Sequence, residues 1–148
     1  MSQLQIEILS FKKENTSQLL SVWEESVLAT HHFLLTDDFR EIKEMLQSFD
    51  FNSLSVFCAF DNKNMAGFIA LHDQKVEMLF VHPNYIGKKV GFQLMQFATT
   101  EHRANQVDVN DQNTTAKHFY EKLGFKTFAI NPKDDMGKDY PIAKMKLM

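Results

Sequence analysis

Residues 86–92 read Ile-Gly-Lys-Lys-Val-Gly-Phe and place two glycines and two lysines directly before a helical pattern. The first N–H groups of a helix have no partner inside the helix and lie at the positive end of its dipole, so they bind anions. Glycine lets the backbone curl until successive N–H groups point into one concavity. The segment indicates a phosphate-binding turn, although a tight strand-to-helix turn with two solvated lysines explains the same residues. It matches neither G-x-x-x-x-G-K-[ST] nor G-x-G-x-x-G.

Three histidines and one cysteine also have side chains that could do chemistry: His31, His32, His72 and Cys58. Histidine titrates near neutral pH and suits proton transfer. The adjacent His31 and His32 have no third ligand at a suitable spacing, so we predict no metal site. Cys58 lies in the apolar run SVFCAF, which favours a buried strand cysteine over a catalytic thiol. A single cysteine excludes an internal disulfide, so we expect the reducing environment of the cytoplasm.

Apolar periodicity predicts the elements that position these residues. Leu4, Ile6 and Ile8 alternate with polar residues as in a strand, and further strands are predicted at residues 54–60, 65–72, 75–81, 106–110, 126–130 and 142–147. Four helices are predicted between them: one capped by Thr16 or Ser17, one capped by Thr36, one from Gly91, and one between Asn113 and Gly124. The second helix is predicted to direct Phe39, Ile42, Met45, Leu46 and Phe49 inward.

The resulting order, βααβββαβαββ, predicts a mixed α/β fold with helices interleaved among strands. We expect residues 1–148 to form one domain, since the chain is long enough for one core and short for two. The net charge of −3 argues against a general nucleic-acid binder. No apolar run approaches the roughly 18 residues of a membrane span, and the N-terminus does not read as a signal peptide. We therefore expect a cytoplasmic protein.

The strand VEMLFVHP, the Gly-Lys turn, a helix, a short strand and the helix NTTAKHFYEKLGF follow one another in a characteristic order. This arrangement closely resembles the acetyl-CoA-dependent GNAT family of N-acetyltransferases, most strongly over residues 76–125. The segments SVLATHHFL and DDMGKDYPIAKMKL are further similar to small bacterial members whose substrates are poorly defined. The resemblance implies a twisted, mostly antiparallel sheet of about seven strands flanked by about four helices.

The resemblance also implies how acetyl-CoA is bound. The strand before the turn parts from its neighbour in this family, and its main chain, here at Leu79, Phe80 and Val81, binds the pantetheine arm. The turn would hold the pyrophosphate through the N–H groups of Gly87, Lys88, Lys89, Val90, Gly91 and Phe92. Asn113 matches a position that contacts the cofactor, and a helix N-cap explains it equally well. The family turn reads [RQ]-x-x-G-x-[GA], so Ile86 and Lys89 depart from it and put the strength of CoA binding in doubt.

For catalysis, Tyr120 matches the tyrosine that protonates the departing thiolate in many members, whereas helix periodicity alone makes it a core aromatic. Glu77 is the first candidate for the base that deprotonates the amine, and a regular strand would place it on the side of Leu79 and Val81. A solvent-facing strand residue is the alternative. His72, His31 and His32 are further candidates for the base. The predicted acceptor-binding residues are His31, His32, Phe33 and His72.

Together these features predict an acetyl-CoA-dependent N-acetyltransferase that acts by direct transfer to an amine of a small molecule or peptide, without a metal. The alternative is a CoA-binding sensor or interaction domain with little turnover, which the departures at Ile86 and Lys89 favour. The expected partners are acetyl-CoA and an amine acceptor, with no nucleic acid or membrane. The C-terminal strands are suited to pairing in a homodimer.

Overall fold

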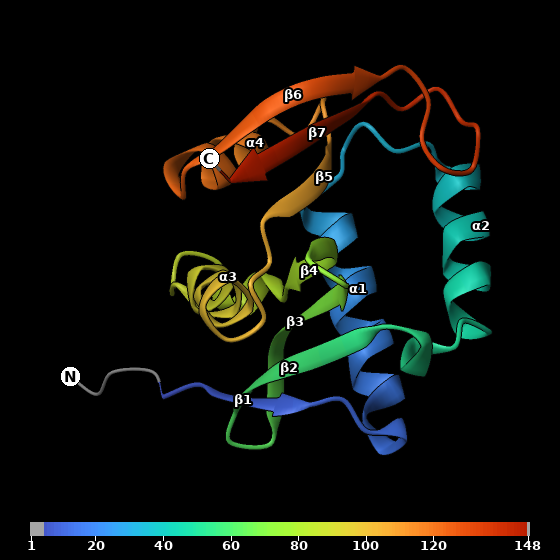
Figure 1. Cartoon of the computed structure of the whole chain (residues 1–148). Coiled ribbons are helices and arrows are strands. Elements are labelled where there is room, and N and C mark those ends of the chain that lie inside the picture. The colour runs from blue at the N-terminus through green and yellow to red at the C-terminus, as the bar shows by residue number, and fades with distance from the viewer. Residues whose placement is uncertain (1–4, 148) are drawn as a thin grey trace.

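The computed structural model describes residues 5–147, which form a seven-stranded sheet in the order β1-β2-β3-β4-β5-β7-β6 (Figure 1). The strands are β1 (Glu7–Ser10), β2 (Ser55–Asp61), β3 (Asn64–His72), β4 (Lys75–Val81), β5 (Gln106–Asn110), β6 (Phe125–Asn131) and β7 (Ile142–Leu147). The helices are α1 (Thr16–Thr30), α2 (Thr36–Gln47), α3 (Val90–Glu101) and α4 (Thr114–Lys122), with short 3₁₀ turns at Lys13–Asn15, Phe51–Ser53 and Pro83–Tyr85. The predicted order of helices and strands is confirmed.

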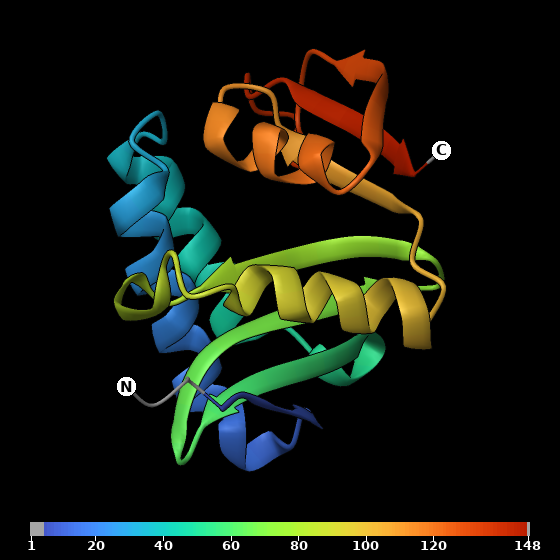
Figure 2. The same ribbon diagram turned by 90° about the vertical axis from the view of Figure 1, so that its left-hand side faces the viewer.

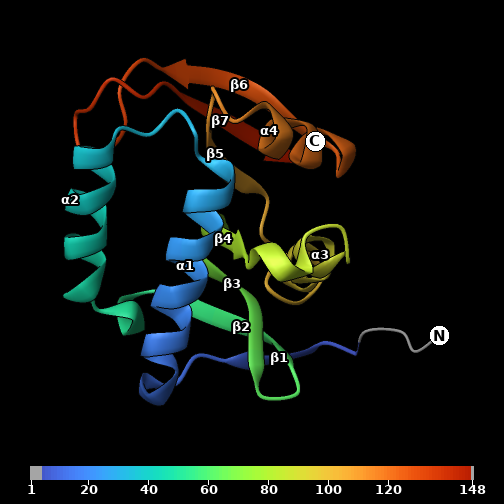
Figure 3. The same ribbon diagram turned by 180° about the vertical axis from the view of Figure 1, so that it is seen from behind.

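Two helices cover each face of the sheet. In Figure 1, α3 and α4 lie on one side of the strands and α1 and α2 on the other, and Figure 3 shows the same layers from behind. One apolar cluster joins Leu94 and Met95 of α3 to Ile69 and Val107 of the sheet. The other joins α1 and α2 to the opposite face through residues such as Trp23, Leu46 and Phe68. Each face of β3 and β4 is therefore held by a separate core.

All pairings in the sheet are antiparallel except that of β4 with β5. This parallel pairing needs a crossover, which α3 supplies along one face of the sheet (Figure 2). Its N-terminus follows the end of β4 after the turn at residues 82–89. The predicted phosphate-binding turn is thus placed at the end of the sheet where β4 stops.

Some details of the helix predictions are wrong. Helix α1 is preceded by Asn15 and α2 by Leu35 at the N-cap positions, so Thr16 and Thr36 are already helical residues. Met45 is 42% exposed, because the face of α2 that packs inward is narrower than its apolar pattern suggests. In the first predicted strand, Leu4 lies outside the described residues and the strand begins at Glu7.

Candidate active site

The strands β4 and β5 meet at one end and part along most of their length. Within residues 5–147 their only ladder pairs are Lys75 with Gln106 and Val76 with Val107. Beyond these pairs β4 continues to Val81 while paired only with β3. The main chain of residues 78–81 therefore has one edge without a neighbouring strand, and such an edge can bind the amides of an extended ligand.

A β-bulge interrupts β4 at Glu77. Ala70 pairs with Met78 and Leu71 with Val76, which leaves Glu77 as the extra residue. Val76, Leu79 and Val81 pack in the core beneath α3, so the alternation of side chains changes phase at the bulge. The expectation that Glu77 lies on the side of Leu79 and Val81 required a regular strand, and this condition is not met.

The Glu77 carboxylate lies instead in a polar cluster on the other face. Lys75 Nζ is 3.7 Å from Glu77 Oε1 and 2.7 Å from Asp108 Oδ2. Asp108 alternates with Val107 and Val109, which pack in the α3 and α4 core, so its side chain points to the face that bears α1 and α2. The bulge thus directs Glu77 to the same face as Met78 and Phe80, which pack against the α1 and α2 core.

The turn between β4 and α3 presents backbone N–H groups without acceptors. In the described part of the chain, no acceptor is bound by the backbone amides of Gly87, Lys89, Val90, Gly91 and Phe92. The Lys88 amide differs, because it donates to the Tyr85 carbonyl at 3.2 Å. The first amide engaged in the helix is that of Gln93, which donates to the Lys89 carbonyl. These free donors and the helix dipole make the turn suitable for a pyrophosphate.

Lys89 adopts the left-handed conformation, with φ 67° and ψ 19°, at the N-cap of α3. This is the position at which the family pattern has glycine, and glycine enters this region without steric cost. Here a lysine adopts this conformation, so its Cβ carries the strain that glycine would avoid. A Cβ at Gly87 would meet no atom within 4 Å, so the turn is open there, whereas one at Gly91 would make ordinary contacts with Phe119 and Val81 at 3.5 and 3.6 Å.

Asn113 caps α4, since its side-chain oxygen accepts the Ala116 N–H at 3.1 Å. The structure thus confirms the structural role of Asn113. The side-chain NH₂ remains available as a donor to a ligand, so the predicted cofactor contact stays a prediction.

Tyr120 lies on α4 and is only 6% exposed. Its ring contacts Phe119 and Phe125, with centroid separations of 5.1 Å and 6.0 Å. Burial raises the pKa of the Tyr120 phenol well above its usual value, so the hydroxyl keeps its proton at neutral pH. Within residues 5–147 this hydroxyl makes no hydrogen bond, as suits a donor that is held for a substrate atom.

Residues of the connection between α1 and α2 lie beside the free stretch of β4. The His31 ring is 6.1 Å from the Phe80 ring and 5.3 Å from the Phe33 ring. His32 is exposed on the same segment. The structure therefore brings His31 and Phe33 next to the predicted pantetheine strand, on the face that bears α1 and α2.

His72 lies elsewhere. It ends β3, pairs with Lys75, and has an exposed side chain next to Asp73. Phe68, the partner of Phe80, is four residues away along β3, or about 13 Å at the usual rise of a strand. The structure does not bring His72 to His31 and Phe33.

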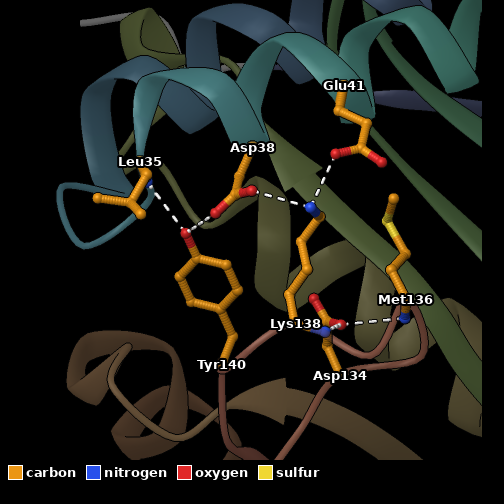
Figure 4. A network of polar contacts seen from close by, with 7 residues as sticks. All are labelled: Leu35, Asp38, Glu41, Asp134, Met136, Lys138 and Tyr140. Carbon is orange, nitrogen blue, oxygen red and sulfur yellow. Dashed lines mark hydrogen bonds and ion pairs between the residues drawn. The ribbon is translucent and has the colours of Figure 1, made fainter.

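A contact network that the sequence did not reveal fixes the α1–α2 connection (Figure 4). The Tyr140 hydroxyl accepts the Leu35 N–H at 3.1 Å and donates to Asp38, while Lys138 Nζ is 2.9 Å from Asp38 and 2.7 Å from Glu41. We call this set of residues the clasp: Leu35, Asp38 and Glu41 at the start of α2, and Lys138 and Tyr140 of the β6–β7 loop. The only sign of the clasp in the sequence was the similarity of the segment DDMGKDYP to family members. No local pattern reveals the clasp, because the residues that it joins lie about 100 positions apart.

Cys58 is fully buried, and burial raises the pKa of its thiol to about 12, which makes it unreactive. Within residues 5–147, no three His, Cys, Asp or Glu side chains are grouped so as to hold a metal ion. No helix of this part of the chain has the length and apolarity needed to cross a membrane.

The fold and the site define a class of protein: an acyltransferase whose parted strands and amide-lined turn accept an acyl-CoA. Residues 17–142 match the acetyltransferase (GNAT) domain family. The chain is 32% identical over 142 residues to a peptidyl-lysine N-acetyltransferase, YjaB, of Salmonella typhimurium, covering 96% of this chain and 98% of that protein. It is likewise 32% identical over 141 residues to YjaB of Escherichia coli, covering 95% of each.

Solved structures give the same result. The solution structure of apo-form YjaB from Escherichia coli has a TM-score of 0.90 at 31% identity, covering 97% of this chain and 98% of that chain. The fold also matches a PaiA N-acetyltransferase from Thermoplasma acidophilum solved in complex with coenzyme A, with a TM-score of 0.74 at 23% identity, covering 97% and 99%. The chain belongs to the GNAT family of acetyltransferases. It is an acetyl-CoA-dependent N-acetyltransferase, as the sequence predicted, and the sensor alternative is not favoured.

Proposed function

We propose that this N-acetyltransferase transfers the acetyl group to the side-chain amine of a peptide lysine. The observation on which the proposal rests is the parting of β4 from β5, which leads directly into the open amides of the α3 turn. The choice of acceptor is supported by two relatives at 32% identity, whose names describe peptidyl-lysine N-acetyltransferases.

Acetyl-CoA would lie along β4 and end at the turn. The main chain of Leu79, Phe80 and Val81 would bind pantetheine, since this edge of β4 has no strand beside it. The N–H groups of Gly87, Lys89, Val90, Gly91 and Phe92 would bind the pyrophosphate, with Lys88 adding charge rather than an amide. Acetyl-CoA would supply a thioester whose thiolate is a good leaving group, and the residues of the chain would bind and orient it.

Tyr120 is our candidate for the acid that protonates the departing sulfur. Its side chain is 6% exposed, and its hydroxyl is protonated and without another partner in the described chain, so it is free to donate a hydrogen bond to a substrate atom. General acid catalysis of this kind contributes about 10²–10⁴-fold to a rate.

Glu77 stays a predicted catalytic residue. Its ion pair with Lys75 is long, because Lys75 lies closer to Asp108, and Asp108 is also 3.7 Å from Lys144 Nζ. Two lysines thus balance two carboxylates in this cluster, and Glu77 is the carboxylate held less closely by them. One domain over residues 1–148, the cytoplasmic location and a homodimer through the C-terminal strands also stay predictions.

The proposal is tested with two peptides that differ only in one residue, lysine in the first and arginine in the second. We expect acetyl-CoA and the protein to acetylate the lysine peptide, with release of one CoA thiol per acetyl group, and to leave the arginine peptide unmodified. Mass spectrometry locates the acetyl group and thiol titration gives the stoichiometry.

A panel of small diamines and amino acids, assayed in the same way, distinguishes an enzyme that uses another acceptor from a protein that transfers no acetyl group. Thiol release with small amines and none with the lysine peptide would contradict the peptide acceptor. Stabilisation by acetyl-CoA without transfer to any amine would contradict the enzymatic function itself; ligand at about 100 times its Kd stabilises by about 2.7 kcal/mol.

A further inference from the structure

Thr30, the last residue of α1, links a backbone carbonyl to a histidine. Its Oγ1 is 2.7 Å from the Ser26 carbonyl oxygen and 2.8 Å from Nδ1 of His31. A carbonyl oxygen can only accept a hydrogen bond, and two oxygens at this distance with no proton between them repel each other. The single hydroxyl proton of Thr30 must therefore point to Ser26.

This orientation determines the tautomer of His31. With its proton used on Ser26, Thr30 Oγ1 can only accept, so the proton of neutral His31 lies on Nδ1. The other nitrogen, Nε2, then has a free lone pair. His82 shows the opposite arrangement, because its Nδ1 accepts the Asn84 N–H and its proton must lie on Nε2.

The surroundings of His31 suit a base. The ring is half-buried between Phe33 and Phe80, and Phe80 lies on the strand that would bind pantetheine. Burial, and then the charge of the neighbouring His32, lower the pKa of His31, so the imidazole is neutral at pH 7. The β6–β7 loop contributes Tyr140 beside Phe33, and the Tyr140 hydroxyl is occupied by Asp38 and Leu35.

We propose that Nε2 of His31 is the general base of the acetyl transfer and that Thr30 is the positioning residue that keeps this nitrogen unprotonated. This inference rests on the proposed function. The neutral lysine amine attacks the thioester carbon, and as the C–N bond forms the nitrogen gives a proton to Nε2. The C–S bond then breaks, its electron pair goes to sulfur, and the thiolate takes a proton from Tyr120. Solvent returns a proton to Tyr120 and removes one from His31, so amine and thioester become amide and thiol.

The first test needs no substrate. Long-range ¹H–¹⁵N correlation spectra of the free protein above pH 7 distinguish the two tautomers of a histidine. We expect His31 with its proton on Nδ1 and His82, in the same spectrum, with its proton on Nε2. The Thr30→Val variant should lose the preference at His31 and leave that at His82 unchanged. A proton on Nε2 of His31 in the wild type would overturn the proposal.

The second test compares kinetics with the lysine peptide. We expect His31→Gln to lower kcat by about 10²-fold or more and to remove the acidic limb of the pH profile of kcat. Thr30→Val should lower kcat several-fold with KM unchanged, and Thr30→Ser, which keeps the hydroxyl, should restore it. His118→Gln, an exposed change on α4, is the matched control. A His31→Gln enzyme that keeps its kcat and its acidic limb would overturn the proposal.

The two tests also separate this inference from the proposed function. A wild-type protein that does not acetylate the peptide but shows the expected His31 tautomer would contradict the peptide acceptor, and the small-amine panel then supplies the substrate for the same kinetics. Loss of the acidic limb in Glu77→Gln, with the limb retained in His31→Gln, would assign the base to Glu77 and refute the role of His31.

Discussion

The left-handed conformation of Lys89 leads to a prediction about stability that has a built-in control. Glycine and alanine variants at Lys89 remove the same charge and differ only in the Cβ atom. Since φ is 67° at this position, glycine should be more stable there than alanine. At Lys88, whose φ is not positive, the order should be reversed.

The magnitude follows from two opposing contributions. A left-handed residue with a Cβ costs about 1–2 kcal/mol, and glycine avoids this cost. Glycine also has more freedom in the unfolded chain, which costs about 0.4–1 kcal/mol. The free energy of unfolding of Lys89→Gly should therefore be about 1 kcal/mol higher than that of Lys89→Ala. At residue 88 the glycine variant should instead be less stable than the alanine variant, by about 0.4–1 kcal/mol. With an unfolding entropy of about 0.3 kcal/mol/K for this chain length, 1 kcal/mol corresponds to about 3 °C in Tm.

Thermal and urea unfolding of the four variants measure these differences. Calorimetric titration with CoA completes the experiment, because it shows whether the Cβ of Lys89 obstructs the phosphate. We expect Lys89→Gly to bind CoA within tenfold of the wild type, since the free amides of the turn are already in place. A gain of tenfold or more, about 1.4 kcal/mol, would show that the lysine impairs the turn.

The reasoning would be refuted by equal stability of glycine and alanine at residue 89, or by the same preference at both lysines. Either result would mean that the backbone of the turn is not fixed in the conformation described.

Three further predictions concern single substitutions. Gly91→Ala should fold normally and be about 0.5–1 kcal/mol more stable through its helix propensity, because the new Cβ would meet only ordinary contacts. Calorimetry should show a CoA affinity within a few-fold of the wild type, and a less stable variant would contradict the prediction. Tyr120→Phe should keep its Tm and its CoA affinity while losing turnover; unchanged turnover would exclude Tyr120 from the mechanism. Tyr140→Phe should be less stable at neutral pH, because Tyr140 and then Lys138 lower the pKa of Asp38. The difference in stability between wild type and variant is fully present above the usual carboxyl pKa of 3.8 and should shrink as pH falls through the lowered pKa of Asp38. Urea unfolding across the acid range measures it, and a difference that does not change with pH would contradict the prediction.

The order of helices and strands could be predicted because each element has its own periodicity. The alternation in QVDVN and the cap and stop signals of Asn113 and Gly124 are local features, and the structure confirms the elements they predict. The C-terminal strand was likewise predicted at residues 142–147, where it is found.

The orientation of Glu77 could not be predicted in the same way. Its side chain depends on a bulge that arises from the register between β3 and β4, and no residue near Glu77 signals it. The N-terminus of α2 shows the same limit: the sequence indicated Thr36 as the cap, whereas Leu35 takes that position and donates its N–H to Tyr140. A cap supplied from the other end of the chain leaves no local pattern.

The clasp also has a consequence for the order in which the protein matures on the ribosome. Tyr140 and Leu35 are 105 positions apart, so their hydrogen bond cannot form until nearly the whole chain has been synthesised. The hairpins of β2, β3 and β4 involve neighbouring segments and can form long before that. The α1–α2 connection that contains His31 and Phe33 is thus fixed last, so the nascent chain forms the strand proposed to bind acetyl-CoA before it fixes the connection proposed to bind the acceptor.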